Sequence, residues 1–148
     1  MQRQPEPIPL RILFALALGT FTLVLGAVLW GLAGYFSDRV FMLLGLMIGV
    51  GAAGAIVMPL RPISKRTALL LLPAVIIATL SSIFLGELLY IGLFMMRDFN
   101  STLVEAVISV TKSMGEILTA PDSVISGILG LLGAVGGFLM VWSATYTK

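Results

Sequence analysis

The sequence predicts an all-α integral membrane protein with four transmembrane helices and an extracytoplasmic amphipathic helix between the third and the fourth. Three stretches contain no Asp, Glu, Lys or Arg: residues 12–36, 40–60 and 123–144. A fourth stretch, residues 67–96, contains only Glu87. A helix needs about 20 apolar residues to cross the roughly 30 Å of hydrocarbon in a bilayer, and each stretch reaches that length. Because water is absent there, the backbone N–H and C=O groups must bond to one another, which a helix allows within a single segment.

The composition leaves room for this membrane domain and for little else. Of the 148 residues, 59% are hydrophobic and 11% are charged, whereas about 25% of residues are charged in a typical soluble domain. We therefore expect one domain over residues 1–148. The apolar run at residues 12–36 exceeds the roughly 7 to 15 residues of a signal-peptide core, so we expect it to be retained as the first span.

The residue types argue against several classes of function. The chain contains no Cys and no His, which removes thiolate chemistry, Cys-ligated clusters and the usual haem ligand. Neither a catalytic triad nor a metal-ligand cluster can be assembled, so we expect no enzyme activity, no metal and no cofactor. The formal net charge is +2, but the basic residues are scattered rather than gathered in a stripe, which argues against nucleic-acid binding.

The distribution of basic residues predicts the orientation in the membrane. With alternating connections, one side carries Arg3, Arg11, Arg61, Lys65, Arg66 and Lys148, and the other carries Arg39, Arg97 and Lys112. Basic residues favour the cytoplasmic side, so we expect both termini there. We also expect Trp30 and Tyr35 at the headgroup level on the opposite side, because Trp and Tyr are enriched at membrane interfaces.

The connection between the third and fourth spans predicts a helix over about residues 102–119. Its apolar residues recur at spacings of three and four, which puts them on one helix face: Leu103, Val107, Val110, Met114 and Ile117. Thr102 and Glu105 have the spacing of a capping box. We expect this helix on the outer membrane surface, with its apolar face, the predicted docking face, against the bilayer, the spans or a partner.

Glu87 is the single Asp, Glu, Lys or Arg residue within a predicted span. Counted along a helix, it lies about 13 Å below the outer end of the third span. A carboxylate at such a position is a functional hypothesis by default, because burying its charge in the membrane is costly. One interpretation is a site for a proton or cation. The other is a structural residue that ties the third span to a neighbouring helix or to a partner subunit.

Small residues at regular spacing predict close helix packing on three spans, because membrane helices associate along such faces. They are Gly45 and Gly49 in the second span, Ala74, Ala78, Ser82 and Gly86 in the third, and Gly130, Gly133 and Gly137 in the fourth. The fourth span carries two such faces. This favours more neighbours than four helices supply, and hence a second copy of the chain or another subunit.

The first two spans resemble the first hairpin of small uncharacterised bacterial four-span membrane proteins. The shared pattern consists of Gly26, Ala27, Trp30 and Tyr35 followed by Gly45, Gly49 and Gly54. This resemblance carries no function. Proteolipid rotor subunits also combine four spans with a buried Glu, but that residue lies in their last span, whereas Glu87 lies in the third.

The sequence favours a non-catalytic accessory, assembly or structural subunit of a larger complex in a bacterial cytoplasmic membrane. Its expected partners are the lipid bilayer and either other membrane subunits or further copies of itself. The alternative is a small homo-oligomeric transporter or channel in which Glu87 binds a proton or cation.

Overall fold

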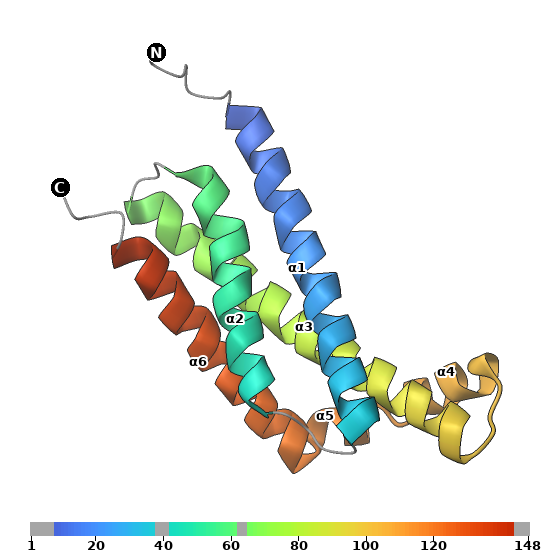
Figure 1. Cartoon of the computed structure of the whole chain (residues 1–148). Helices are drawn as coiled ribbons and strands as arrows, with labels where there is room; N and C mark the ends of the chain where they lie inside the picture. Colours follow the sequence, from blue (N-terminus) through green and yellow to red (C-terminus); the bar gives the residue numbers. More distant parts are fainter. Residues whose placement is uncertain (1–7, 38–41, 62–64, 144–148) are drawn as a thin grey trace.

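The computed structural model describes residues 8–37, 42–61 and 65–143, and all regular structure in these ranges is helical. The long helices are α1 (Ile8–Ser37), α2 (Met42–Val57), α3 (Lys65–Asp98) and α6 (Pro121–Ser143). A single 3-10 turn, η1 (Met58–Leu60), follows α2 directly. Two short helices, α4 (Leu103–Lys112) and α5 (Met114–Thr119), connect α3 to α6. In Figure 1, α3 crosses behind the other long helices and extends past them toward α4.

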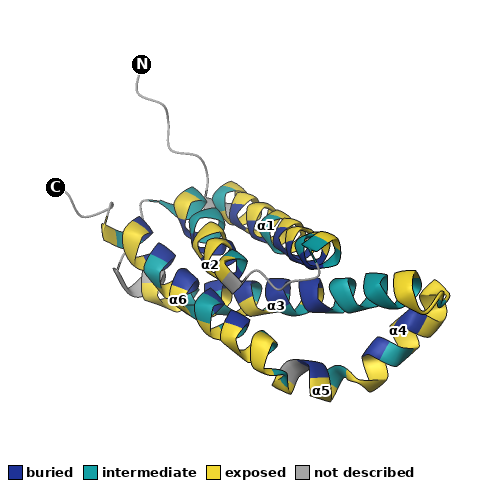
Figure 2. Ribbon diagram, turned by 60° about the horizontal axis from the view of Figure 1, so that its bottom comes forward, coloured by how far each residue is buried: buried dark blue, intermediate teal, exposed yellow. Residues whose placement is uncertain are grey.

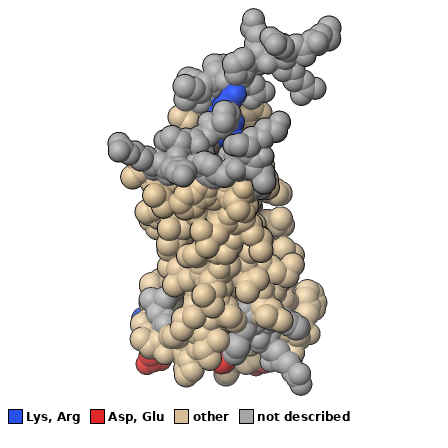
Figure 3. All heavy atoms as spheres, turned by 90° about the vertical axis from the view of Figure 1, so that its left-hand side faces the viewer, with Lys and Arg blue, Asp and Glu red and all other residues tan. Residues whose placement is uncertain are grey.

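Four helical segments are long and apolar enough to cross a membrane, which confirms the predicted number of spans. They are Leu10–Ser37, Leu43–Leu60, Leu69–Asp98 and Pro121–Ser143. On the face shown in Figure 3, the coloured charged residues lie at the two ends and leave the body between them uncharged. Large apolar side chains such as Leu13, Leu16 and Phe21 are exposed on α1, as a lipid-facing surface requires. The chain is therefore an integral membrane protein.

The helix α2 packs most extensively against α6, and glycines bring the two backbones together. A Cβ atom added at Gly45 would lie 2.8 Å from the Ser126 carbonyl oxygen, and one added at Gly49 would overlap the α6 backbone. On α6, added Cβ atoms at Gly133 and Gly137 would in turn overlap the α2 backbone. Since real Cβ atoms need more room, this seam depends on glycine from both helices.

The second extensive contact joins α1 to α3, which run in the same direction. Of the small residues predicted to pack on α3, Ser82 and Gly86 are buried, whereas Ala78 is half-buried and Ala74 is exposed. The Ser82 hydroxyl donates a hydrogen bond of 2.9 Å to the Leu23 carbonyl on α1. The packing face thus covers only the second half of the predicted row.

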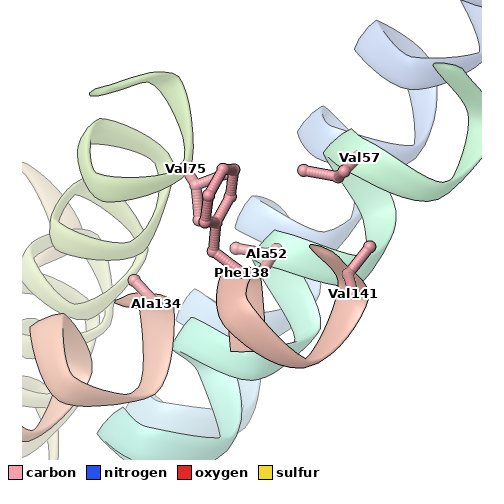
Figure 4. Close-up of a cluster of buried hydrophobic side chains, with 7 residues drawn as sticks. Ala52, Val57, Val75, Ala134, Phe138 and Val141 are labelled. Atoms are coloured by element: carbon pink, nitrogen blue, oxygen red, sulfur yellow. The ribbon is translucent and has the colours of Figure 1, made fainter. Parts of the chain in front are cut away.

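The apolar interior gathers at the level where α2, α3 and α6 meet. Its buried members are Ala52, Ala53, Val57, Val75, Ala134, Phe138 and Val141. Figure 4 shows the Phe138 ring of α6 beside Val75 of α3. Only 2% of Phe138 is exposed, and it is the largest fully buried side chain in the described part of the protein.

Both small-residue faces of α6 are occupied within the same chain. Gly130 faces Ile83 of α3, while Gly133 and Gly137 face α2. The two faces were expected to favour a neighbour outside the four helices. Since α2 and α3 cover them, they provide no argument for an additional subunit.

Arginines join neighbouring helices at both ends of the bundle. At one end, the Arg97 guanidinium donates to the Tyr35 carbonyl at 3.2 Å and lies 5.1 Å from the centroid of the Tyr35 ring. At the other end, Arg61 donates to the Val141 carbonyl in the last turn of α6, and its own carbonyl accepts from Arg11 at 3.0 Å. Positive charge near the C-terminus of a helix is favourable, because the exposed carbonyls there carry partial negative charge.

The predicted orientation uses Arg11, Arg61 and Arg97 only as positive charges, but these residues also make defined contacts. Arg3, Arg39 and Lys148, which belong to the same charge count, lie outside the described residues.

Candidate functional site

Glu87 is buried inside the bundle, with 6% of its surface exposed. Its neighbour Gly86 packs against Trp30 of α1, and Ile83, one turn earlier, packs against α6. This placement directs the carboxyl group toward the junction of α1, α3 and α6. There it interacts with the Trp30 side chain and with the Ser123 hydroxyl. Glu87 therefore joins three of the four long helices.

The depth of Glu87 in the bundle depends on which helix, α3 or α6, is used as the reference. Counted along α3, it lies about 16 Å from the end of that helix at Asp98. Counted along α6, it is level with the first turn, because its partner Ser123 is the third residue of that helix. The exposed Asp122 in the same turn acts on Glu87 with a second negative charge. The carboxyl group thus lies near the start of α6 rather than beside its middle.

Two oxygen atoms in this region are buried and have no hydrogen-bond partner among the described residues. They are Oε1 of Glu87 and Oγ of Ser126. Ser126 is fully buried on α6, about one turn beyond Ser123. Leaving a polar group buried and unpaired costs about 1 to 3 kcal/mol, more for a charged group. Buried polar atoms without a partner are unusual in a folded interior, so this level of the bundle is a candidate functional site.

The other buried hydroxyl groups on α3 are satisfied. Thr79 donates to the Val75 carbonyl at 2.8 Å within its own helix, and Ser82 bonds α1. Among the described residues of α3, the buried polar atom without a hydrogen-bond partner therefore belongs to Glu87.

Trp30 differs from its expected role. It was expected to anchor the first span at the headgroup level, but it is buried in the protein with 4% of its surface exposed. The indole N–H is a hydrogen-bond donor only, and it faces a carboxyl group that accepts. A sequence signal for this burial exists, because Gly26, Trp30 and Gly34 recur every four residues and share a helix face.

The second candidate site is α4, whose start matches the predicted capping box. The Glu105 backbone N–H donates to Thr102 Oγ1 at 3.4 Å, and Glu105 Oε2 accepts from the Thr102 N–H at 2.8 Å. The Thr102 hydroxyl also donates to Glu105 Oε2 at 2.9 Å. Because these hydrogen bonds favour the charged carboxylate, they lower the pKa of Glu105.

The predicted helix over residues 102–119 is divided into α4 and α5, which meet at Ser113. The five residues of the predicted docking face lie on both sides of this break, and they differ in exposure. Val110 and Ile117 are buried and Met114 is half-buried, whereas 68% of Leu103 and 57% of Val107 are exposed.

A different set of apolar residues is exposed on α4. Its buried side consists of Ala106 and Val110, which lie on the side toward α3. Its exposed side, here called the α4 apolar face, consists of Leu103, Val104, Val107 and Ile108. Figure 2 shows α4 at the far end of α3, away from the other long helices, with much of its surface exposed.

No protein-family model matches this chain. Searches of curated proteins and of solved structures also found no match. Function must therefore be inferred from the residues of the two candidate sites.

The two sites differ in their chemistry. Among the described residues, no three His, Cys, Asp or Glu side chains lie together in a way that could hold a metal ion. The Glu87 region offers one carboxyl group, two hydroxyl groups and one N–H donor, which suits proton exchange and hydrogen bonding. The α4 apolar face offers only hydrophobic contact, with Glu105 and Lys112 at its polar border.

Proposed function

We propose that this protein is a non-catalytic accessory subunit of a larger membrane complex and that the α4 apolar face is its docking surface. The observation that carries this proposal is the exposure of four large apolar side chains on one side of a short helix outside the long helices. Contiguous apolar surface with a polar border is typical of interaction sites.

The fold around α4 supports a defined surface rather than a loose connection. The capping box fixes the first turn, and Ala106 and Val110 hold the opposite side toward α3. A docking surface held in place before binding loses less conformational freedom when the partner arrives. We place the protein in a bacterial cytoplasmic membrane, with both termini in the cytoplasm and α4 on the opposite side.

The test of this proposal is the composition of the particle extracted gently from its native membrane. We expect unrelated chains at fixed stoichiometry, and Val107→Lys should weaken their association at least tenfold, because it would bury a charge in an apolar contact. Ser113→Lys adds the same charge at an exposed position outside the face and should leave association unchanged. A particle that contains only this chain would overturn the proposal.

A second candidate function is a small homo-oligomeric transporter or channel, and the unpartnered Glu87 Oε1 favours it. In proteoliposomes, Glu87→Gln should then abolish proton or cation flux while leaving assembly intact. Glu116→Gln neutralises an exposed carboxylate and serves as the matched control. Equal flux in the wild-type protein and in Glu87→Gln would remove this function.

A further inference from the structure

Polar residues at the start of α6 lead from the surface to Glu87. Asp122 is exposed, Ser123 is half-buried, and Ser126 is fully buried. These three residues occupy the first two turns of α6, and the first two act on the Glu87 carboxyl group. Exposure therefore falls step by step from the helix start toward the two unpartnered oxygen atoms.

Beyond this level, the interior offers no continuation among the described residues. Ile83 lies one turn before Glu87 on α3 and fills the space over Gly130 of α6. The next buried polar side chains along α3, Ser82 and Thr79, already donate to backbone carbonyls, and Ser81 between them is only half-buried. The polar path therefore ends at Glu87 and Ser126 and opens only toward the start of α6.

The groups around Glu87 suit a proton better than a metal cation. The Trp30 N–H faces the carboxyl group and cannot ligate a cation, because it is a donor only. The hydroxyl group of Ser123 can donate to a carboxylate or accept from a carboxylic acid. Intramembrane carboxyl groups with such neighbours serve as proton relays in membrane proteins.

The charged surroundings of Glu87 are simple. Asp122 of α6 acts on it with negative charge. The helix α1 contributes the neutral Trp30 indole, and α2 contains no ionisable residue. The ionisable residues of α4 and α5, which are Glu105, Lys112 and Glu116, are exposed.

We propose that Glu87 is a proton-exchange site that opens only to the side of the protein on which α6 begins, with Ser123 on the path. A hydronium ion arriving past Asp122 transfers its proton to Oε1 and leaves as water. This inference does not depend on the docking role of α4.

The experiment uses the full chain in proteoliposomes and a hydrophobic carbodiimide. This reagent adds to a protonated carboxyl group in apolar surroundings and forms an N-acylurea with no leaving group. Peptide mass then gives the labelled fraction of Glu87. We expect labelling to fall as pH rises, and Glu87→Gln should remove the label from that peptide.

Sidedness comes from changing pH on one side of the vesicles at a time. The chain has no Cys, so Thr119→Cys near the start of α6 provides a unique thiol. Its reaction with an impermeant maleimide identifies the side on which α6 begins. Labelling should follow the pH of that side alone. Labelling that follows the opposite side, or that ignores pH, would overturn the proposal, as would protection by sodium ions at constant pH. None of these readouts depends on subunit association.

Discussion

At the end of α3, the Arg97 guanidinium contacts groups from two helices. It bonds the Tyr35 carbonyl, lies over the rings of Tyr35 and Phe94, and pairs with Asp98 at 2.6 Å. The planar guanidinium can make hydrogen bonds in its plane while its face rests on an aromatic ring. The end of α1 is thereby attached to α3.

Arg97→Ala should lower the free energy of unfolding by about 1 kcal/mol, because it removes a hydrogen bond and ring contacts at a partly exposed position. Arg97→Lys should recover only part of this loss, since an ammonium group cannot reproduce the planar contacts. Thermal unfolding in detergent micelles measures both, with the exposed Lys112→Ala as control. If both Arg97 variants were as stable as the Lys112→Ala control, the Arg97 contacts would contribute nothing to the free energy of unfolding.

At the scale of whole helices, the glycine seam between α2 and α6 is the most extensive contact of the bundle. Gly49→Ala should destabilise the protein by about 2 kcal/mol or more, because the new methyl group would force two backbones apart. Gly54→Ala is the matched control on the same helix, since its Cβ would meet nothing within 4 Å. That control should be neutral or stabilising by up to about 1 kcal/mol.

The same comparison can be repeated on α6. Gly133 faces the Leu46 backbone, whereas Gly136 has open space around an added Cβ. The free energy of unfolding should therefore be lower for Gly49→Ala than for Gly54→Ala, and lower for Gly133→Ala than for Gly136→Ala. If Gly49→Ala and Gly133→Ala were as stable as their controls, the close approach of the two helices would be refuted.

The helix α4 should respond to acid through Glu105. Its carboxylate accepts two hydrogen bonds from Thr102, and these lower its pKa below the ordinary value of 4.5. The stabilisation of the first turn is therefore complete above pH 4.5 and is lost as pH falls through the lowered pKa. Backbone chemical shifts of residues 103–107 should report loss of helix only in that acidic range.

Glu105→Ala should show a frayed first turn at neutral pH and no further change on acidification. Glu116→Ala, on α5, leaves the capping box intact and should behave like the wild-type protein. A pH response of α4 that persists in Glu105→Ala would assign it to another group.

For the whole molecule, the spans were predictable because their signal is local. A charge-free run of sufficient length specifies a membrane helix regardless of its neighbours. The capping box of Thr102 and Glu105 was predictable for the same reason, because both partners lie within one turn. The break at Ser113 was not, since an apolar repeat continues through it and the nearest glycine, Gly115, lies two residues beyond it.

Pairing between helices follows from contacts that are distant in sequence, and the sequence alone left it open. The glycine spacing indicates that Gly49 packs closely, but it does not name α6 as the partner. For the same reason Glu87 was recognisable as a candidate site, whereas its contacts with Trp30 and Ser123 come from two other helices. Spacing rules apply to residues within one helix, so they do not identify the helix that packs against it.

The glycine seam also has a consequence for biosynthesis. The residues that complete α2 belong to α6, which leaves the ribosome only after all of α3 has been made. Until α6 has been made, the glycine face of α2 is exposed to lipid or to other membrane helices. A nascent protein that stalls before residue 121 is therefore open to capture by another membrane helix, and its release from the insertion machinery marks the moment at which that vulnerability ends.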